Sequence, residues 1–383
     1  MRVWAFCAVS SAAIAVNACG SSTGASSTTP TASHTATASA TPSAGPPLVV
    51  WTVTSGGSTA IRTLTPTGGS PHTIATIPSN STILGVGGGK LVYMTSPTAL
   101  HVVSLASGAD ASFTTGASGS DTLFGGAVSP DGTKVAYTVA TMSSGSSLKV
   151  LTVATGASST VHMYSGGPVP APVLWTTSTI VATDVVPYSD AGPQAAAGLN
   201  PTTGDEIANT SVAGAAGPVY GADGTHVANA IHTPTLGDDG DSQGGPGPQM
   251  PFNTLRTFSL GGTPAIVYQK PHHNVNTLAV STAGTNVLFF NDSSVGGFAG
   301  ISMSPDFGLF MYASGAPPVQ VEKLDGPRWD GAAFAEDSTA FAARHVGSRE
   351  ELTLIAGSHS SPNVVDTVNA GDQPVFVGFS PIS

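Results

Sequence analysis

The stretch GAVSPDGTKVAYTVA, residues 126–140, decides the fold of this chain. It contains two apolar strands joined by the turn SPDG, residues 129–132. Pro130 fixes φ near the value that the second position of a type I turn needs, and Gly132 accepts a left-handed conformation. Residues 133–138 then alternate with a period of two, which is typical of a strand with two different faces. The stretch therefore predicts a tight β-hairpin.

The same hairpin recurs along the sequence. Positions equivalent to Asp131 are Gly87, Thr177, Asp223, Ala283, Asp337 and Ile382. A second series of strand–turn–strand segments interleaves with the first, and its copies begin at Ile61, Leu100, Leu148, Ala197, Leu255, Leu309 and Leu352. Two hairpins make four antiparallel strands, and a repeat of roughly 40–50 residues is typical of a propeller blade. The sequence thus predicts an all-β propeller of seven four-stranded blades, with six or eight blades as alternatives.

The two ends of the repeat region complement each other. The last turn, residues 379–382, has no following strand, and the first strand, residues 48–54, has no preceding partner. Pairing of residues 375–379 with residues 48–54 would complete one blade from both ends of the chain. A closed ring avoids the free strand edges that promote aggregation. We therefore expect the C-terminal strand to close the first blade.

The turn at residues 129–132, followed by Val135, Ala136 and Tyr137, resembles the WD40-like repeat of TolB-type β-propellers from the bacterial envelope. Residues 221–224, GADG, form a partial second copy, whereas Ser304-Pro305-Asp306 is out of register and suggests an inserted hairpin. The resemblance extends over residues 48–383 and implies a propeller. Because this family includes scaffolds, binding proteins and propeller halves of enzymes, it implies a fold rather than an activity.

The first nineteen residues have the features of an export signal. Arg2 is followed by an apolar stretch and by small residues before Cys19. Residues 16–19, VNAC, resemble the lipobox of bacterial lipoproteins, although Asn17 stands where a small or apolar residue is usual. The resemblance implies cleavage between Ala18 and Cys19 and attachment of lipid to Cys19. The alternative is ordinary cleavage after Ala18, which would leave Cys19 free and the protein secreted.

These features divide the chain into three parts. Residues 1–18 are predicted to be a lipoprotein signal peptide, residues 19–47 a tether and residues 48–383 the propeller domain. The tether is rich in Ser, Thr, Ala and Pro and lacks the apolar residues needed for a core, so we expect it to be disordered. This organisation predicts a protein on the outer face of the cell membrane, which it contacts through the lipid on Cys19.

The composition excludes several classes of function. Only 11 Lys and Arg accompany 22 Asp and Glu, which is too few cations for a nucleic-acid-binding patch. Both cysteines, Cys7 and Cys19, precede the propeller, so the propeller has no disulfide and no thiolate metal site. The adjacent His272 and His273 would point to opposite faces of a strand and would not share a metal. No cofactor, metal ligand or catalytic residue is predicted.

The longest interval between turns contains a polar segment, residues 236–250. Long loops on a rigid scaffold often carry binding residues, so Asp238, Asp239 and Asp241 are candidate binding residues. The alternative is a solvated acidic loop, because the acidic ligands of an EF-hand are not present at the required spacing. Asp184 is expected in a blade loop, with no partner that the sequence identifies.

The sequence therefore predicts an exported module that binds or scaffolds at the cell envelope, with an envelope protein or a glycan as its partner. The alternative is a hydrolase or lyase, similar to propeller lactonases or glycan lyases, that uses the central funnel. Such an enzyme would need ionisable side chains that converge on the axis. A third possibility is a sensor module whose catalytic partner is a separate chain. The lining of the central channel distinguishes between a binding protein and an enzyme.

Overall fold

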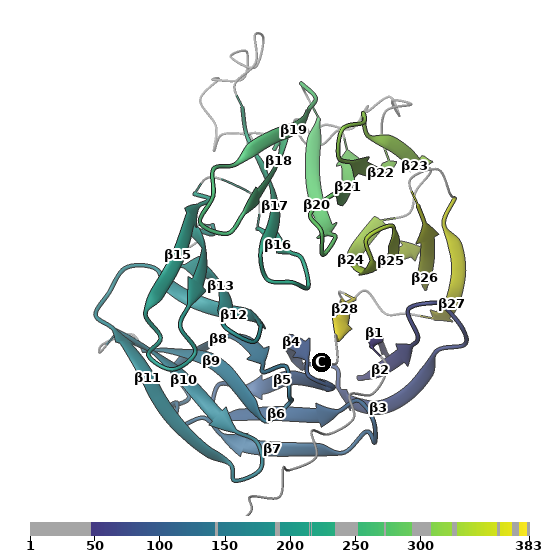
Figure 1. The fold of residues 1–383 in the computed structure, drawn as a ribbon. Coiled ribbons are helices and arrows are strands. Elements are labelled where there is room, and N and C mark those ends of the chain that lie inside the picture. Colours follow the sequence, from purple (N-terminus) through teal and green to yellow (C-terminus); the bar gives the residue numbers. More distant parts are fainter. Residues whose placement is uncertain are drawn as a thin grey trace, which may run out of the picture. The chain divides into compact units, whose positions relative to one another are not determined.

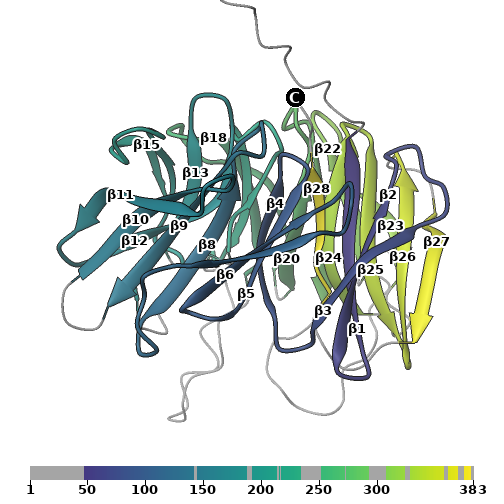
Figure 2. The same cartoon turned by 90° about the horizontal axis from the view of Figure 1, so that it is seen from below.

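The computed structural model describes residues 47–141, 145–187, 192–213, 215, 217–233, 252–271, 273–292, 308–323, 328–357, 361–369 and 375–380. These residues form seven four-stranded antiparallel sheets that surround a central axis as the blades of a propeller (Figures 1 and 2). The predicted all-β fold and the number of blades are confirmed. Within the described residues no helix is long and apolar enough to cross a membrane.

The strands of each blade follow one another outward from the axis, except that blade 1 takes its innermost strand from the C-terminus. Blade 1 contains β28 (Val377–Ser380), β1 (Leu48–Ser55), β2 (Ser58–Leu64) and β3 (His72–Pro78). Blade 2 contains β4 (Thr82–Gly87), β5 (Lys90–Ser96), β6 (Ala99–Ser104) and β7 (Asp110–Thr114). Blade 3 contains β8 (Thr122–Val128), β9 (Lys134–Thr141), β10 (Gly145–Thr152) and β11 (Ala157–Tyr164).

The remaining blades repeat this order. Blade 4 contains β12 (Val169–Trp175), β13 (Ile180–Val185), β14 (Ala195–Leu199) and β15 (Glu206–Ser211). Blade 5 contains β16 (Val219–Tyr220), β17 (His226–Ile231), β18 (Thr254–Ser259) and β19 (Ala265–Gln269). Blade 6 contains β20 (Asn274–Val280), β21 (Asn286–Asp292), β22 (Gly308–Ala313) and β23 (Val319–Lys323). Blade 7 contains β24 (Arg328–Glu336), β25 (Thr339–Val346), β26 (Arg349–Ala356) and β27 (Asn363–Asn369).

The SPDG stretch forms the predicted turn between β8 and β9. The Gly132 amide donates to the Ser129 carbonyl at 2.8 Å, and Gly132 has a φ of 68°. The Asp131 carboxylate accepts hydrogen bonds from the Ser129 hydroxyl at 2.6 Å and the Thr133 amide at 3.1 Å. These bonds satisfy polar groups that the reversal of the chain would otherwise leave unpaired.

The expected ring closure is also confirmed. Antiparallel pairing joins β28 to β1, with Trp51 opposite Val377 and Leu48 opposite Ser380. Next to this ladder, the Thr52 amide donates to the Phe376 carbonyl at 3.0 Å, and the Phe376 amide donates to Thr52 Oγ1 at 3.1 Å. The first and last described strands thus share one sheet, which leaves no unpaired innermost strand in blade 1.

The hydrophobic core lies between neighbouring blades. Between blades 7 and 1, for example, Trp51 and Val53 belong to the same buried cluster as Phe341 and Leu352. Trp51, Phe341 and Leu352 are fully buried. Complete burial of a large apolar side chain contributes about 1.5–3 kcal/mol, so interfaces of this kind stabilise the ring.

A cross-strand Trp–Arg pair reinforces two of these interfaces. Arg62 lies opposite Trp51, stacks over its indole ring and forms an ion pair with Asp366 of blade 7 at 2.5 Å. In blade 7 the same arrangement recurs, because Arg344 lies opposite Trp329, covers its ring and pairs with Glu322 of blade 6. Each guanidinium therefore joins its own blade to the outermost strand of the preceding one.

The prediction for Asp184 was wrong. Asp184 belongs to β13 and not to a loop, since it pairs with Ala195 of β14 and with Pro170 of β12. The apolar run that begins at Ile180 continues as a strand to Val185, beyond the acidic residue.

Candidate functional site

The two faces of the propeller carry connections of different length. One face, here called the turn face, carries the turn at residues 129–133 and the other connections between first and second strands and between third and fourth strands. The opposite face, here called the loop face, carries the connections between second and third strands and between blades. The strands that flank the longest intervals in the chain, β17 and β18 and then β21 and β22, are second and third strands of their blades, so β17 and β21 end, and β18 and β22 begin, at the loop face. Long loops on a rigid scaffold are common sites of binding.

The described chain begins on the turn face. Leu48 at the start of β1 lies opposite Ser380, and the Ser380 hydroxyl accepts a hydrogen bond from Gly89 at 3.1 Å. Gly89 belongs to the tight turn between β4 and β5. Since β1 then runs to Ser55 at the loop face, the described chain begins on the opposite face, the turn face.

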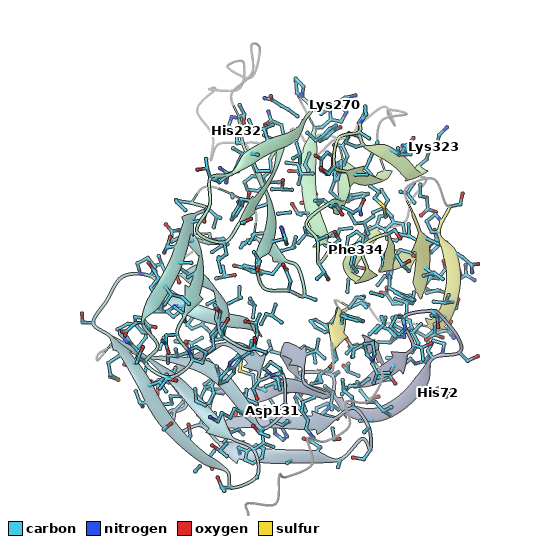
Figure 3. All side chains as sticks on the ribbon, in the orientation of Figure 1. His72, Asp131, His232, Lys270, Lys323 and Phe334 are labelled. Carbon is cyan, nitrogen blue, oxygen red and sulfur yellow. The ribbon has the colours of Figure 1, made fainter. Side chains whose placement is uncertain are left out.

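The central channel is apolar. A cavity of about 300 Å³ lies between the innermost strands of blades 1, 2, 4, 5, 6 and 7. Its lining consists of aliphatic and aromatic residues and glycines, namely Leu84, Gly85, Val86, Val173, Leu174, Val219, Tyr220, Ala222, Leu278, Ala279, Val280, Ala332, Ala333, Phe334, Phe376, Val377, Gly378 and Phe379. Figure 3 shows Phe334 at the inner edge of its blade, with His72, Lys270 and Lys323 at the periphery.

Tyr220 is the one lining residue of this channel that has an ionisable group. Its hydroxyl donates to the Ala182 carbonyl at 3.1 Å and lies 2.8 Å from Thr183 Oγ1. Burial raises the pKa of Tyr220 well above its ordinary value. Among the residues that the structure describes, the channel lining therefore contains no acid–base pair of the kind that the enzyme alternative requires.

Blade 3 has no residue in this lining, and its innermost strand packs very closely against the innermost strands of blades 2 and 4. A Cβ on Gly126 of β8 would lie 2.6 Å from the Leu84 side chain of β4. A Cβ on Gly125, whose φ is 64°, would lie 2.1 Å from the Pro172 carbonyl oxygen of β12. Only glycine permits this approach.

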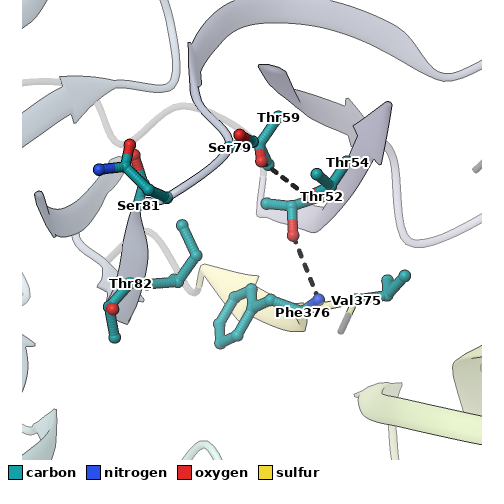
Figure 4. A pocket seen from close by; sticks show the side chains of 10 residues that line it. Thr52, Thr54, Thr59, Ser79, Ser81, Thr82, Val375 and Phe376 are labelled. Carbon is teal, nitrogen blue, oxygen red and sulfur yellow. Dashed lines mark hydrogen bonds between the residues drawn. The ribbon is translucent and has the colours of Figure 1, made fainter. Parts of the chain in front are cut away.

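A second cavity, of about 450 Å³, opens on the loop face between blades 1 and 2. We call it the hydroxyl pocket, because six of its lining side chains are alcohols (Figure 4). Its lining residues are Thr52, Thr54, Thr59, Ser79, Asn80, Ser81, Thr82, Ile83, Val375 and Phe376. None of these side chains carries a charge. Phe376 also lines the channel and so separates the two cavities.

Hydrogen bonds hold the deepest hydroxyls of this pocket in place. Thr54 Oγ1 lies 2.7 Å from Thr59 Oγ1, and Thr52 Oγ1 accepts the Phe376 amide. All three threonines are at least nine-tenths buried. Ser81 Oγ is also buried, and it has no hydrogen-bond partner among the described residues. The pocket thus has a fixed floor of hydroxyls and one buried polar group that is not satisfied.

An acidic cluster lies elsewhere, at the interface of blades 3 and 4. Burial, and to a lesser extent the charge of Glu206, raises the pKa of Asp184 to about 6. Burial and the carboxylates of Asp184, Glu206 and Asp205 raise the pKa of Tyr164 to about 12. Within the described part of the chain, no group of three or more His, Cys, Asp or Glu side chains could hold a metal ion.

The predicted site residues are not among those that the structure describes. Ala18, Cys19, Asp238, Asp239 and Asp241 all lie outside the described ranges. His272 and the Ser304-Pro305-Asp306 segment lie outside them as well. The hydroxyl pocket was missed because its residues come from three separate segments, 52–59, 79–83 and 375–376. Serine and threonine are so common in this chain that their presence in these segments gave no signal.

No family model and no curated protein matches this sequence. Among solved structures, the chain is similar to the β-propeller domain of the trilobed protease from Pyrococcus furiosus, with 12% identity and a TM-score of 0.47. The similarity covers 85% of this chain and 86% of that one. It is also similar to oligogalacturonate lyase in complex with manganese, with 16% identity, a TM-score of 0.48 and coverage of 83% and 84%.

TolB from Acinetobacter baumannii is a further similar structure, with 14% identity, a TM-score of 0.43 and coverage of 87% of this chain and 66% of that one. The chain spans 42% of the length of a prolyl endopeptidase that it matches with 13% identity. These distant similarities include TolB, peptidases and a lyase, and they assign no activity to this chain.

Proposed function

We propose that this protein is an exported, lipid-anchored β-propeller that binds an envelope protein or glycan through its loop face. The observation that carries this proposal is the position of the hydroxyl pocket. It opens on the face opposite Leu48, where the N-terminal segment joins the propeller. A lipid on Cys19 and a tether over residues 19–47 would hold the protein at the membrane by its turn face and leave the loop face available to a ligand.

The nature of the two cavities supports binding rather than catalysis. The channel is lined by apolar side chains and the hydroxyl pocket by neutral ones. General acid–base catalysis needs a positioned group that exchanges a proton, and nucleophilic catalysis needs a nucleophile with an adjacent base. Neither arrangement is present among the described residues that line these cavities. Neutral alcohols beside an aromatic ring are suited to holding a ligand.

Lipid attachment is tested by metabolic labelling. The full chain is expressed in a bacterial host that processes lipoproteins, with an alkyne-tagged fatty acid in the medium, beside a Cys19→Ser control. We expect label in the membrane-bound wild type and none in the control, because Cys19 would carry the lipid. An unlabelled wild-type protein in the soluble fraction would contradict the anchoring.

The binding face is tested by site-specific photocrosslinking in cells. A benzoylphenylalanine replaces the exposed Asn80 at the rim of the hydroxyl pocket or, as a matched control, the exposed Ala106 in the turn between β6 and β7. Both positions belong to blade 2 or to the connection that leads into it, but they lie on opposite faces. We expect a discrete adduct from position 80 alone. Adducts from position 106 alone would contradict the proposed orientation.

A further inference from the structure

We infer that the hydroxyl pocket is a binding site for a neutral saccharide. This inference deepens the proposed binding role, because it names the chemical class of the ligand. It does not depend on the lipid anchor, since it rests on the side chains that line the pocket. The reasons are the neutrality of the lining, its free hydrogen-bonding capacity and the aromatic ring on one wall.

The lining suits a ligand that has many hydroxyl groups and no charge. Each serine or threonine hydroxyl both donates and accepts a hydrogen bond, as does each hydroxyl of a sugar. An ionic ligand would lose its hydration in this pocket without meeting an opposite charge, which is strongly unfavourable. A wholly apolar ligand would bury the hydroxyls of Thr52, Thr54 and Thr59 away from water without adding hydrogen bonds.

The pocket retains hydrogen-bonding capacity that the protein does not use. Thr52 Oγ1 accepts the Phe376 amide and still has its own proton to donate. One hydrogen bond joins Thr54 to Thr59, so one of these two hydroxyls keeps its proton for a ligand. Ser81 Oγ is buried and has no partner among the described residues.

One wall of the pocket matches the apolar face of a sugar ring. Phe376 lies beside Ile83 and Val375 in the lining. The Phe376 ring packs over Gly378, where a Cβ would lie only 2.7 Å from its Cε1 atom. The absence of a side chain at position 378 thus leaves room for this ring. An aromatic face offers a flat apolar surface to the C–H groups of a pyranose while the hydroxyls opposite bind its polar edge.

A peptide would need different groups. Recognition of an extended peptide uses unpaired backbone N–H and C=O groups along a strand edge, with which the peptide forms a ladder. In this pocket the second strand of blade 1, β1, is paired on both sides, by β28 and by β2. The polar groups that remain are mainly side-chain hydroxyls. We therefore assign a saccharide rather than a peptide to the site.

The test measures saccharide binding by isothermal titration calorimetry. The protein is the full chain with Cys19→Ser, so that lipid does not affect the measurement. The probes are maltotriose, cellotriose, mannotriose and chitotriose, each up to about 10 mM, with tetraalanine as the peptide probe. We expect saturable binding of at least one trisaccharide and none of tetraalanine.

Two variants then place the ligand in the pocket. Thr54→Val with Thr59→Val removes both members of one hydrogen bond, so it leaves no unpaired group and the fold is expected to persist. Phe376→Leu keeps apolar bulk but removes the aromatic face. We expect each to weaken binding at least about tenfold. The control is Thr65→Val with Thr67→Val, because these hydroxyls also form a pair, 3.2 Å apart, in the turn between β2 and β3 of the same blade. This pair is exposed, so the loss of the further bond from Thr65 to the Gly68 carbonyl is compensated by water.

The control pair should leave the affinity unchanged. Absence of binding by all four trisaccharides overturns the inference, as does binding that both pocket variants leave unaltered. Saturation by tetraalanine and by no saccharide would overturn it in favour of a peptide site. Because the protein in this test carries no lipid, these outcomes are independent of the labelling experiment on Cys19.

Discussion

Replacing Asp184 by Asn tests how the interface between blades 3 and 4 accommodates a charge. The carboxyl group lies on the same face of β13 as Ala182, two residues away, and Ala182 packs in the apolar cluster between these blades. The part of the chain that the structure describes gives this carboxylate no cationic partner. Burial and the nearby Glu206 raise its pKa to about 6. The ionised form is therefore disfavoured in the folded protein.

The size of this effect follows from the pKa. A rise from 3.8 to about 6 corresponds to at most about 3 kcal/mol, because each unit of pKa is worth about 1.36 kcal/mol. The carboxyl group remains partly in contact with solvent, which screens its charge, so we expect about 1–1.5 kcal/mol. The native state binds this proton more tightly than the unfolded chain. The resulting stabilisation is complete below about pH 4 and is lost as the pH rises through about 6.

The free energy of unfolding is measured by urea denaturation at about pH 4 and about pH 8. Near pH 8, Asp184→Asn should be more stable than the wild type by about 1–1.5 kcal/mol, because the amide carries no charge. Near pH 4 the difference should nearly vanish. The control is Asp205→Asn, in the connection between β14 and β15. It removes the same charge from a side chain that is 66% exposed, and its contact with His162, at 3.4 Å, is an exposed one that contributes little to stability.

The outcome depends on the difference between the two pH values, not on the absolute stability of either protein. If Asp184→Asn raises the free energy of unfolding by the same amount near pH 8 and near pH 4, the reasoning is refuted. A gain that does not depend on pH cannot come from the charge of Asp184. A loss of stability near pH 8 would refute it as well, since Asp184 would then have a partner that favours its charge.

Two further predictions concern ring closure, and both are measured as changes in thermal unfolding. Arg62→Met should destabilise the fold by about 2–3 kcal/mol, because it leaves the largely buried Asp366 carboxylate without its partner. The double variant Arg62→Met with Asp366→Leu should recover most of this lost stability, because no unpaired charge remains. An unchanged midpoint in Arg62→Met would show that the ion pair contributes nothing. Gly378→Ala should cost about 1–3 kcal/mol, because its Cβ would lie 2.6 Å from Val86 Cγ1 and 2.7 Å from Phe376 Cε1. A wild-type midpoint there would mean that the Phe376 ring moves aside without cost.

The blades could be predicted from the sequence because their signals are local. The turn at residues 129–132 contains the residues whose conformations it requires, and degraded copies recur once per blade. Counting those copies gave seven blades, and the unmatched strand at each end of the series predicted the pairing of β28 with β1. Each of these inferences depended on residues close together in the chain or on their spacing.

The contacts between blades could not be predicted in this way. Arg62 and Asp366 are far apart in the sequence, and only the closed ring brings them together. The Ser-Asp-Ala-Gly residues that follow Tyr188 are typical of a loop, so the sequence predicts that Asp184 lies in that loop, whereas β13 continues to Val185. No local pattern distinguishes an acidic residue in a strand from one just beyond its end, because burial against the neighbouring blade decides the environment.

The closing strand also builds the candidate site, and this links ligand binding to stability. Thr52 comes from β1 and Phe376 from the segment before β28, and the two hydrogen bonds between these residues, 3.0 and 3.1 Å long, form part of the pocket wall. Opening of the ring would separate the hydroxyls from the aromatic ring. A ligand that contacts both therefore binds only the closed ring, and at a concentration one hundred times its Kd it would stabilise that state by about 2.7 kcal/mol. The pairing that removes a free strand edge thus also places the hydroxyls and the aromatic ring of the pocket beside each other.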